Sequence, residues 1–422
     1  MSTSAISTPA PGTLWWVTDQ LPYPPRNGVT LPSYHHAVAL ATCQPLRLVL
    51  LVDVASPPDA AALKANEDRF GPILSVPLKR LGRLRRLVDE LMGREMFQHG
   101  YVGARSDMPR IQPSPCDRLL VTPASAVAKL RASGILDIRQ FTASVAMVND
   151  CTAGEYHYRL QERAGDWRHR IKGAIDRLRS RGIGRIEREL LKPYTHAVLQ
   201  TPKDREILAH LVDAGLAERA RLAPNGVNEA LFGLQGGDRQ DIVFMAELSG
   251  EYGPIAQWLV TEVWPLLPHE GYRLRIVGKG ASPALLELLD RTPGVVHESF
   301  VPRLESVYEQ AAIAISPVFK GFGLINKTLE AMVSGVPVVG GQAAFNGVTG
   351  FVAGRHGVVC ARADAQLFAR ELAALMRDRP RQAEIGSAGR ALVSGGFRWD
   401  ASSATIASLL GLPWPTHDGK AG

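Results

Sequence analysis

The sequence has few cysteines and no long apolar run. Its four cysteines, Cys43, Cys116, Cys151 and Cys360, lie far apart and form no Cys-x-x-Cys pair, which argues against a zinc cluster or redox motif and favours reduced thiols in a cytoplasm. No stretch of about 18 apolar residues occurs, so we expect no membrane-spanning helix. Residues 1–12 begin without the basic and apolar regions of a secretory signal, and we expect them to form a disordered leader.

The common phosphate-binding and metal-binding signatures are also missing. The loop RIVGKGAS, with Lys279 between Gly278 and Gly280, is too short for a Walker loop and lacks the Gly-x-Gly-x-x-Gly spacing. Lys279 is a candidate for contact with a phosphate, although a solvated loop lysine is the ordinary alternative. No convincing Asp-x-Asp site is found, so we expect neither a metal nor a cofactor.

What the sequence does have is enough length and apolar content for two folded domains. It has 422 residues, 45% of them hydrophobic and 21% charged, which excludes a disordered, collagen-like or coiled-coil chain. Lys and Arg outnumber Asp and Glu by 48 to 41, for a formal net charge of +7. Such a balance is compatible with nucleic acid, an anionic membrane surface or a phosphorylated small molecule as partner.

One segment, residues 159–192, carries most of the excess positive charge. It holds eleven Lys or Arg against five Asp or Glu, and its apolar residues fall mostly at helical intervals, which predicts amphipathic helix. A solvated face is the ordinary explanation, and a patch that binds an anionic membrane surface is the alternative. The segment lacks interleaved aromatic residues and no base-reading motif is present, so we expect no nucleic acid partner.

Strand-like runs alternate with helix-like segments along both halves of the chain. TLWWVT, a Pro-rich and Gly-containing loop, a helical pattern and RLVLLVDV form a βαβ unit. The alternation restarts at residue 241, with its first helix expected over about 254–267. The pattern predicts two Rossmann-like doubly wound α/β domains with a ligand cleft between them. The expected boundaries are a first domain over 13–225, a second over 226–396, a linker within 222–240, a helix over 397–412 returning to the first domain, and a tail over 413–422.

The most informative loop is SPVFKGFGLINKTLEAM, which follows a predicted strand of the second half. A Gly-x-Gly turn, Gly321 and Gly323, precedes a helix that opens with Asn326 and Lys327 and carries Glu330 one turn later. A helix start with glycine N–H groups and an ammonium suits a diphosphate, and a carboxylate can accept hydrogen bonds from both hydroxyls of a ribose. An ordinary βαβ crossover would not explain this cluster of residues.

In the first half, the loop DQLPYPPRNG follows the opening strand. Gly28 would let a backbone N–H approach a phosphate, while a Pro-rich turn without ligand explains the composition equally well. Asp19 either faces the cleft or caps the loop. His35 and His36 on the next helix are weaker candidates. Asp150, at the end of a later strand, is a further candidate, and a helix cap is equally compatible with it.

Together these segments resemble the retaining GT-B glycosyltransferases of family 4. The resemblance covers nearly the whole chain and is carried, in the family's order, by WWVTDQLPYPPRNG, LAPNGVNEALF, LRIVGKG, AISPVFKGFG, NKTLEAMVSGVPVV and FRWD. The Pro-Tyr-Pro-Pro loop and the Asn-Lys-x-Leu-Glu-Ala-Met helix are similar to those of bacterial exopolysaccharide and exosortase-associated sugar transferases.

The resemblance implies transfer of a sugar from a UDP- or GDP-sugar, with retention, to a glycan, lipid-linked or other hydroxyl acceptor in bacterial polysaccharide or glycoconjugate biosynthesis. It implies a cytoplasmic protein, peripheral at the inner membrane face if the basic segment binds lipid. Glu330 would bind the ribose, Lys327 would lie near the diphosphate, and Gly28 would meet that diphosphate from the other domain. The implied donor-binding set is Gly28, Lys279, Gly321, Gly323, Leu324, Asn326, Lys327 and Glu330; the implied catalytic set is Lys327, Glu330 and Asp150; the implied acceptor set is Asp19, Asn27 and Asp150.

The chain departs from the family pattern at two points. Lys320 stands where the wider family has the first Glu of a Glu-x7-Glu pair, and AELSGEYGP supplies no Arg or Lys after the first strand of the second domain. Lys327, Lys279 and Arg303 would then carry the phosphate compensation. These departures keep open a nucleotide-sugar-binding module that has lost turnover. A nucleotide-sugar epimerase on the same fold is a further alternative.

Overall fold

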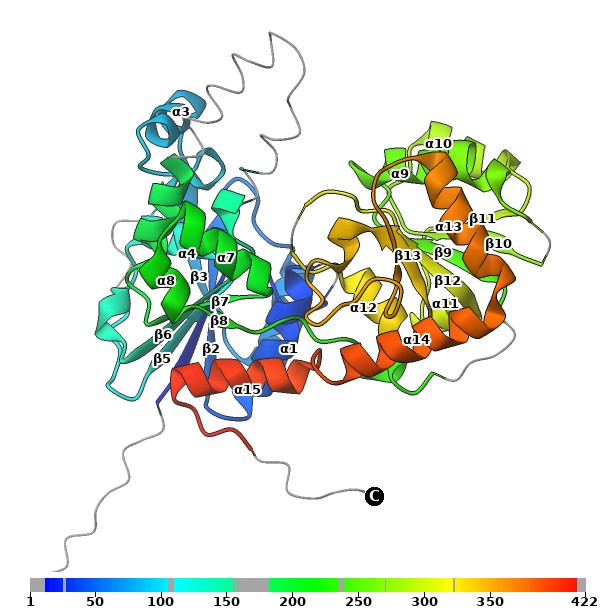
Figure 1. Cartoon of the computed structure of the whole chain (residues 1–422). Coiled ribbons are helices and arrows are strands. Elements are labelled where there is room, and N and C mark those ends of the chain that lie inside the picture. Colours follow the sequence, from blue (N-terminus) through cyan, green and yellow to red (C-terminus); the bar gives the residue numbers. More distant parts are fainter. Residues whose placement is uncertain are drawn as a thin grey trace, which may run out of the picture. The chain divides into compact units, whose positions relative to one another are not determined.

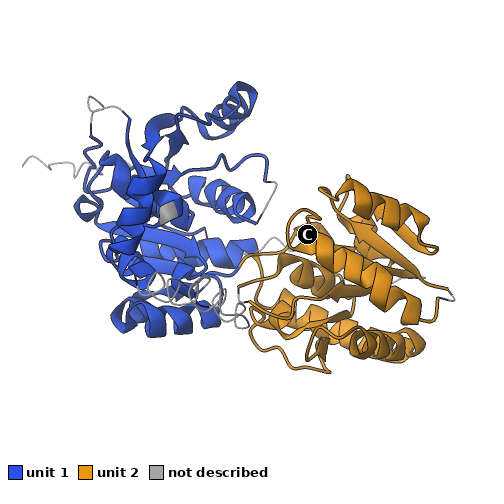
Figure 2. Cartoon of the chain, turned by 90° about the horizontal axis from the view of Figure 1, so that it is seen from above, with its two compact units in different colours: residues 1–224, 399–422 blue, residues 225–398 orange. Residues whose placement is uncertain are grey.

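The structure is a computed structural model of the chain, and it describes residues 12–25, 28–104, 110–154, 157, 182–234, 239–269, 271–321 and 323–415. The chain divides into two compact units, coloured separately in Figure 2. Unit 1 is Met1–Pro224 with Trp399–Gly422, and unit 2 is Asn225–Arg398.

Unit 1 contains one eight-stranded sheet in the order β4-β3-β2-β1-β5-β6-β7-β8 (Figure 1). All neighbouring strands are parallel except β3 and β4, which pair antiparallel at one edge. The strands are β1 Leu14–Thr18, β2 Leu46–Asp53, β3 Leu74–Arg80, β4 Tyr101–Gly103, β5 Arg118–Val121, β6 Ala143–Asn149, β7 His196–Leu199 and β8 Arg221–Leu222.

Helices of unit 1 come from both ends of the chain. The sequence-order helices are α1 Thr30–Ala41, α2 Ala60–Phe70, α3 Arg83–Leu91, α4 Ala124–Ser133, α7 Pro202–Leu211 and α8 Ala214–Arg219, and α15 Trp399–Leu410 joins them from the C-terminal end. Short 3-10 turns occupy Phe97–His99 and Ile138–Gln140. Of the basic segment 159–192, residues 182–191 are helical, and residues 159–181 lie outside the described part of the chain.

Helix α15 packs against α1 on one face of the unit 1 sheet. The rings of His35 and Trp399 stack with centroids 4.4 Å apart, and the Nδ1 atom of His36 lies 2.8 Å from the hydroxyl oxygen of Ser403. The apolar side of α15, with Ile406, shares a buried cluster with Trp16 of β1. This helix therefore completes the core of unit 1 although it follows unit 2 in the sequence.

Unit 2 contains a six-stranded parallel sheet in the order β11-β10-β9-β12-β13-β14. The strands are β9 Asp241–Met245, β10 Arg273–Val277, β11 Val295–Glu298, β12 Ala311–Ser316, β13 Val338–Gly341 and β14 Val358–Cys360. The helices are α9 Tyr252–Trp258, α10 Pro283–Arg291, α11 Glu305–Gln310, α12 Asn326–Val333, α13 Ala365–Arg377 and α14 Arg379–Ser394, with 3-10 turns at Glu229–Leu231 and Gln342–Phe345.

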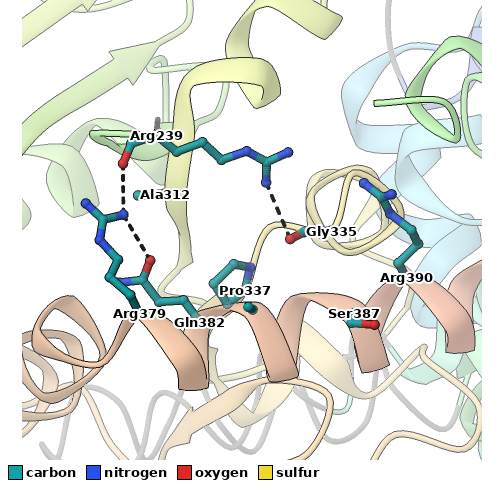
Figure 3. A pocket seen from close by; sticks show the side chains of 9 residues that line it. Arg239, Ala312, Gly335, Pro337, Arg379, Gln382, Ser387 and Arg390 are labelled. Atoms are coloured by element: carbon teal, nitrogen blue, oxygen red, sulfur yellow. Dashed lines mark hydrogen bonds between the residues drawn. The ribbon is translucent and has the colours of Figure 1, made fainter. Parts of the chain in front are cut away.

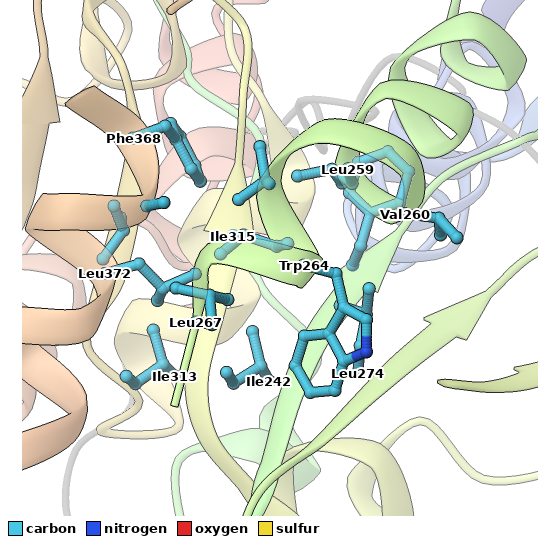
Figure 4. Close-up of a cluster of buried hydrophobic side chains, with 14 of the residues drawn as sticks. Ile242, Leu259, Val260, Trp264, Leu267, Leu274, Ile313, Ile315, Phe368 and Leu372 are labelled. Atoms are coloured by element: carbon cyan, nitrogen blue, oxygen red, sulfur yellow. The ribbon is translucent and has the colours of Figure 1, made fainter. Parts of the chain in front are cut away.

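Alternate residues of the central strand of unit 2 enter two separate cores. Ile242 and Phe244 of β9 join the cluster that contains Trp264, drawn in Figure 4, whereas Val243 between them joins the cluster beneath α12. Successive side chains of a strand point to opposite faces, so both faces of this sheet are covered. Two doubly wound α/β units are thus present, as the sequence predicts.

The first helix of unit 2 is less regular than expected. Over the range expected as a helix, 254–267, α9 ends at Trp258, a π-helical turn follows over Leu259–Val263, and a 3-10 turn covers Trp264–Leu266. Pro265, inside the last turn, has no N–H to donate to the helix ladder. The ring of Trp264 is buried and its indole N–H donates to the carbonyl of Pro293 at 3.0 Å.

Candidate functional site

The candidate site of unit 2 lies where the strand order of its sheet reverses. The first strand, β9, has β10 on one side and β12 on the other, and in open α/β sheets ligands bind at the carboxyl ends of the strands at such a point. The loop 317–325 leaves β12 at this edge and leads directly into α12. The fold thus places the Gly-x-Gly turn and the Asn-Lys-x-x-Glu helix start at the switch point.

The backbone of this loop depends on its glycines. Gly321 has φ +114° and Gly323 has φ +95°, a region that residues with a Cβ rarely adopt. Leu324 follows and packs against the buried cluster below α12. Helix α12 begins at Asn326 without a side-chain cap and without an acidic residue in its first turn. Its first N–H groups and positive end therefore remain suited to an anion.

Lys327 and Glu330 are in direct contact on α12. The Lys327 Nζ atom lies 2.9 Å from Oε2 and 3.2 Å from Oε1 of Glu330. The Glu330 side chain is 8% exposed and that of Lys327 is 43% exposed, so the carboxylate is set into the domain and the ammonium is at its surface. The structure brings together these two residues, which the sequence assigns to ribose and diphosphate.

Tyr308 is a member of this group that the sequence analysis missed. Its hydroxyl donates to Oε2 of Glu330 at 3.2 Å from a fully buried position on α11. Burial and then the Glu330 carboxylate raise the pKa of Tyr308 well above its usual value, so the hydroxyl keeps its proton and acts as a donor. Tyr308 lies on a short helix with ordinary helical spacing, and nothing in its local sequence marks it.

Asn225 is a second missed residue. Its Nδ2 atom lies 3.0 Å from Oδ1 of Asn326, which ties the Pro-Asn-Gly turn at the start of unit 2 to the start of α12. Thr328, also in the first turn of α12, donates to the hydroxyl oxygen of Ser316, the last residue of β12, at 3.1 Å. Pro-Asn-Gly is an ordinary turn sequence within the expected linker 222–240, and it does not by itself mark Asn225 as a site residue.

The Lys279 loop lies at the same edge of the sheet, two strands from β12. A Cβ on Gly278 would lie 1.7 Å from the carbonyl oxygen of Ala246, so a glycine is required there. The Lys279 carbonyl accepts the Leu248 N–H at 2.7 Å, and its side chain is 70% exposed with Nζ 3.9 Å from Glu247. The exposed Lys279 ammonium is accessible to a ligand, but it makes no described contact with Lys327 or Glu330.

Two other cations, Arg303 and Lys320, follow strands that end at this edge of the sheet. Arg303 is 68% exposed and lies 4.0 Å from Glu305 and 3.8 Å from Glu309. Lys320 is exposed on the loop before the glycines. Neither makes a described contact with α12.

In unit 1, the acceptor candidate Asp19 follows β1 at the corresponding switch point, between β1 and β5. Its side chain is 4% exposed and pairs with Lys129 of α4 at 2.8 Å, while its Oδ1 atom is buried without a hydrogen-bond partner. Burial lowers the pKa of the nearby His99 to about 4, and the charges of Asp19 and Lys129 act on the same ring with opposite sign. Asp19 is therefore part of a buried polar cluster whose capacity to accept hydrogen bonds is incompletely used.

The two remaining loop candidates of unit 1 differ. Gly28 has open space, since nothing lies within 4 Å of the position a Cβ would take, and its φ is outside the left-handed region, so the fold itself does not require a glycine there. Asn27 lies outside the described residues.

Asp150 is exposed just beyond β6, next to a strained residue. Asn149 has φ +66°, the one positive φ among the described non-glycine residues, and its Oδ1 atom is buried without a hydrogen-bond partner. Such strain gathers at functional sites. The sequence predicts a role for Asp150, whereas the backbone strain and the unpaired buried oxygen belong to its neighbour Asn149.

A separate pocket of about 360 Å³ lies at the opposite edge of the unit 2 sheet, by the amino ends of β12 and β13 (Figure 3). Arg239 donates to the carbonyl of Gly335 at 3.4 Å, and Arg390 donates to that of Ser334 at 2.8 Å. These arginines satisfy carbonyl groups at the C-terminal end of α12. Ligands of open α/β sheets bind at the carboxyl ends of the strands, so this pocket is separate from the candidate site.

Two further observations concern membrane-spanning helices and metal sites in the described part of the chain. None of the described helices is both long enough and apolar enough to span a membrane. Within the described ranges, no group of three or more His, Cys, Asp or Glu side chains is arranged to hold a metal ion.

Comparison with known proteins gives matches at two levels. Residues 239–378 match the family model described as glycosyl transferases group 1. No curated protein matches the sequence. Among solved structures, the chain is similar to Anabaena Alr3699/HepE in complex with UDP, with a TM-score of 0.63, 16% identity and coverage of 94% of this chain and 99% of that one.

Two further structures extend this likeness. Sucrose-phosphate synthase from Thermosynechococcus elongatus has a TM-score of 0.59 at 15% identity, covering 94% of this chain and 98% of that one. A Staphylococcus aureus TarM mutant, in complex with fondaparinux, alpha-GlcNAc-glycerol and UDP, has a TM-score of 0.64 at 10% identity, covering 94% and 99%. The chain therefore has the two-domain GT-B fold of these proteins, and unit 2 is similar over residues 239–378 to the glycosyl transferases of group 1.

Proposed function

We propose that this protein is a glycosyltransferase that takes a sugar from a nucleotide diphosphate sugar and transfers it to a hydroxyl acceptor. The observation that carries the proposal is the Lys327–Glu330–Tyr308 group at the switch point of a unit that matches group 1 glycosyl transferases. Structures of the similar HepE hold UDP and UDP-glucose. This likeness supports a UDP-sugar first, with a GDP-sugar as the other candidate.

In this proposal, unit 2 binds the donor. Glu330 accepts hydrogen bonds from the ribose hydroxyls, because it is a shielded carboxylate held in place by Tyr308. Lys327 and the N–H groups at the start of α12 stabilise the diphosphate. The other proposed donor residues of unit 2 are Lys279, Gly321, Gly323, Leu324 and Asn326, and Gly28 of unit 1 is a further proposed donor residue.

The chemical step needs charge stabilisation more than a dedicated base. The bond from the anomeric carbon to the diphosphate oxygen breaks, and a bond from that carbon to the acceptor oxygen forms. With retention, the acceptor attacks on the same face, and its proton passes to the departing phosphate oxygen. Lys327 and the helix N–H groups lower the barrier by stabilising the charge that develops on that phosphate.

The acceptor is assigned to unit 1. Asp19, Asn27 and Asp150 are the proposed residues that bind or orient it, and the strained Asn149 beside Asp150 supports a site at the end of β6. A glycan or lipid-linked acceptor in bacterial polysaccharide or glycoconjugate biosynthesis, handled in the cytoplasm, is the class that we propose.

Ligand-induced thermal stabilisation tests the donor site. A ligand that binds only the folded protein raises its apparent stability by mass action, so a panel of UDP-, GDP-, ADP- and dTDP-sugars should give a shift for one base. Lys327→Ala and Glu330→Ala should abolish the shift. If both variants retain the shift of the unchanged protein, the site assignment is wrong.

A nucleotide-sugar-binding module without turnover is the second candidate. It is favoured by Lys320 at the place of an expected Glu and by the absence of Arg and Lys from AELSGEYGP after β9. Release of nucleoside diphosphate in the presence of an acceptor extract separates the two proposals. Stabilisation by a nucleotide sugar without release would select the binding module.

A further inference from the structure

Helix α3 of unit 1 exposes its apolar side and buries its charged side. Leu84 is 76% exposed, and Leu87, Val88 and Leu91 are 41%, 42% and 44% exposed. Met92, just beyond the helix, is 58% exposed. These positions recur at intervals of three and four residues, so they form one continuous stripe. Helices of globular proteins normally turn such a stripe toward the core.

The opposite side of α3 attaches the helix to unit 1. Arg86, Asp89 and Glu90 are only 7%, 6% and 1% exposed. The backbone of Glu90 packs against Gly182, where a Cβ would lie 3.4 Å from the Glu90 carbonyl oxygen. The Arg86 stem packs so closely on Gly100 that a Cβ there would lie 2.5 Å from its Cγ. The orientation of α3 is therefore fixed by specific contacts, and the apolar stripe is directed outward by the fold.

The charged residues around the stripe have one sign. Between residues 79 and 94 every exposed charged side chain is Lys or Arg, and the only two acidic side chains, Asp89 and Glu90, are buried. The exposed cations of this region are Lys79, Arg80, Arg83, Arg85 and Arg94. An apolar stripe with a cationic border fits a surface that offers both hydrocarbon and anionic groups.

The basic segment of the sequence joins unit 1 beside this helix. Gly182 lies against the C-terminal end of α3, since a Cβ on Gly93 would be 3.7 Å from the Gly182 Cα. Gly182 belongs to residues 159–192, which hold eleven Lys or Arg against five Asp or Glu. The segment that carries most of the excess positive charge therefore meets unit 1 next to the exposed apolar stripe of α3.

We propose that α3, with Met92 and its bordering cations, is a docking surface for a membrane rich in anionic lipid. The helix would lie along the interface, with its leucines among the acyl chains and its arginines at the headgroup phosphates. We disfavour a second copy of this chain as the occupant, because a two-fold contact through the stripe would bring the same cations together. The inference goes beyond the proposed transfer reaction and uses none of its residues.

Vesicle sedimentation with the full chain tests the surface. Vesicles of phosphatidylcholine alone and of phosphatidylcholine with phosphatidylglycerol are compared at low and high salt. We expect binding to the anionic vesicles, at least tenfold weaker binding to the neutral ones, and weakening by salt. Equal binding to both kinds of vesicle, or none to either, would overturn the proposal.

Matched variants locate the binding. Leu84→Gln/Leu87→Gln/Leu91→Gln removes the stripe and should reduce vesicle binding at least tenfold. Phe300→Gln/Val352→Gln removes two apolar side chains of unit 2, which are 79% and 52% exposed, and should leave binding unchanged. Both variants should keep the nucleotide-sugar thermal shift of the unchanged protein, which reports folding and the donor site independently. Retained binding by the α3 variant contradicts the proposal.

A fluorescent label at Leu84→Cys distinguishes the other occupants. The label should be exposed in the free protein, and its emission should shift to the blue on anionic vesicles. A label already shielded without vesicles would mean that another part of the chain, such as residues 158–181, or a second copy covers the stripe. Sedimentation equilibrium then separates these two cases, and either result overturns the membrane proposal.

Discussion

The Nζ atom of Lys327 lies 2.9 Å from Oε2 of Glu330, so the cation and the carboxylate of the candidate donor site neutralise each other. A nucleotide diphosphate would give each group a new partner, the diphosphate for Lys327 and the ribose for Glu330. The pair is exposed on the lysine side, so the exchange requires no opening of the core. In the proposed function, the contact would keep this buried carboxylate in place until a ribose replaced its partner.

The first prediction concerns the two partners separately. Lys327→Met and Glu330→Gln should each weaken nucleotide-sugar binding roughly ten- to hundredfold, because each removes a charged hydrogen-bonding group. Titration calorimetry with the sugar identified by thermal shift measures this. If Glu330 binds the ribose, the unchanged protein should bind the corresponding 2′-deoxyribose donor more weakly than the ribose donor, whereas Glu330→Gln should bind both about equally. Equal discrimination in both proteins would contradict the ribose assignment.

A second prediction tests the role of Tyr308. Tyr308→Phe removes the hydroxyl that donates to Glu330 at 3.2 Å and keeps the ring in the core. It should weaken donor binding several-fold, less than Glu330→Gln, because the carboxylate keeps its charge but loses a donor that fixes its position. In a double-mutant cycle the two changes should not be additive. Additive effects would separate Tyr308 from the site.

The sequence predicts the parts of the structure that depend on local patterns. Alternation of apolar runs and helical segments predicts both doubly wound units, and the Gly-x-Gly turn before Asn326 and Lys327 predicts a site at the start of a helix. Tyr308 and Asn225 could not be found in this way, because each reaches α12 from a distant segment. A contact between remote residues leaves no spacing in the sequence.

The same reason explains two other differences. Asn149 is a site candidate because of its φ of +66°, which depends on how β6 ends in the fold and has no sequence signature. Its neighbour Asp150 is a candidate from the sequence because it is charged. For α3, the spacing of apolar residues in the sequence does not tell which side of the helix faces the domain. That orientation follows from the packing of Arg86 on Gly100 and of Glu90 on Gly182.

Gly28 offers a prediction in which stability and binding separate. Nothing lies within 4 Å of a Cβ at this position, and its φ is outside the left-handed region. Gly28→Ala and Gly28→Val should therefore leave the unfolding temperature unchanged. If Gly28 meets the diphosphate of the donor, both should weaken nucleotide-sugar binding, the valine more strongly. Unchanged binding by both variants would remove Gly28 from the donor site.

Glu187 makes the stability of unit 1 depend on pH. Its buried carboxylate accepts hydrogen bonds from the backbone N–H groups of Thr152 and Ala153, both at 2.9 Å. Burial is the largest cause of its pKa shift and raises the pKa of Glu187 to about 7. The folded state then holds a proton that the unfolded state releases near pH 4.5. Glu187 should therefore stabilise the folded protein at low pH. Its contribution to the unfolding free energy should decrease by up to about 3 kcal/mol as the pH rises from roughly 4.5 to 7.

Urea unfolding between pH 4.5 and 8 measures this contribution. Because His36 titrates in the opposite direction in both proteins, the two pH profiles are compared by difference: relative to the unchanged protein, Glu187→Gln should lack the decrease of up to about 3 kcal/mol in unfolding free energy. Glu189→Gln, two residues away with a side chain 51% exposed, is the matched control and should retain the decrease. An identical pH dependence in Glu187→Gln and the unchanged protein would contradict the assignment.

The contact between α1 and α15 should weaken in acid. His36, with Nδ1 2.8 Å from the Ser403 hydroxyl, has its pKa lowered to about 3, chiefly by burial and then by His35. A depressed histidine pKa means that the unfolded state takes up the proton first. Stability from this group is thus present above about pH 6.5 and decreases as pH falls, by about 2 kcal/mol at pH 5. Hydrogen exchange in residues 399–410 should accelerate between pH 7 and 5, after correction for the intrinsic rate. His36→Gln should reduce the acceleration and the exposed control His210→Gln should not, because His36 lies in the α1–α15 contact whereas His210 lies on α7.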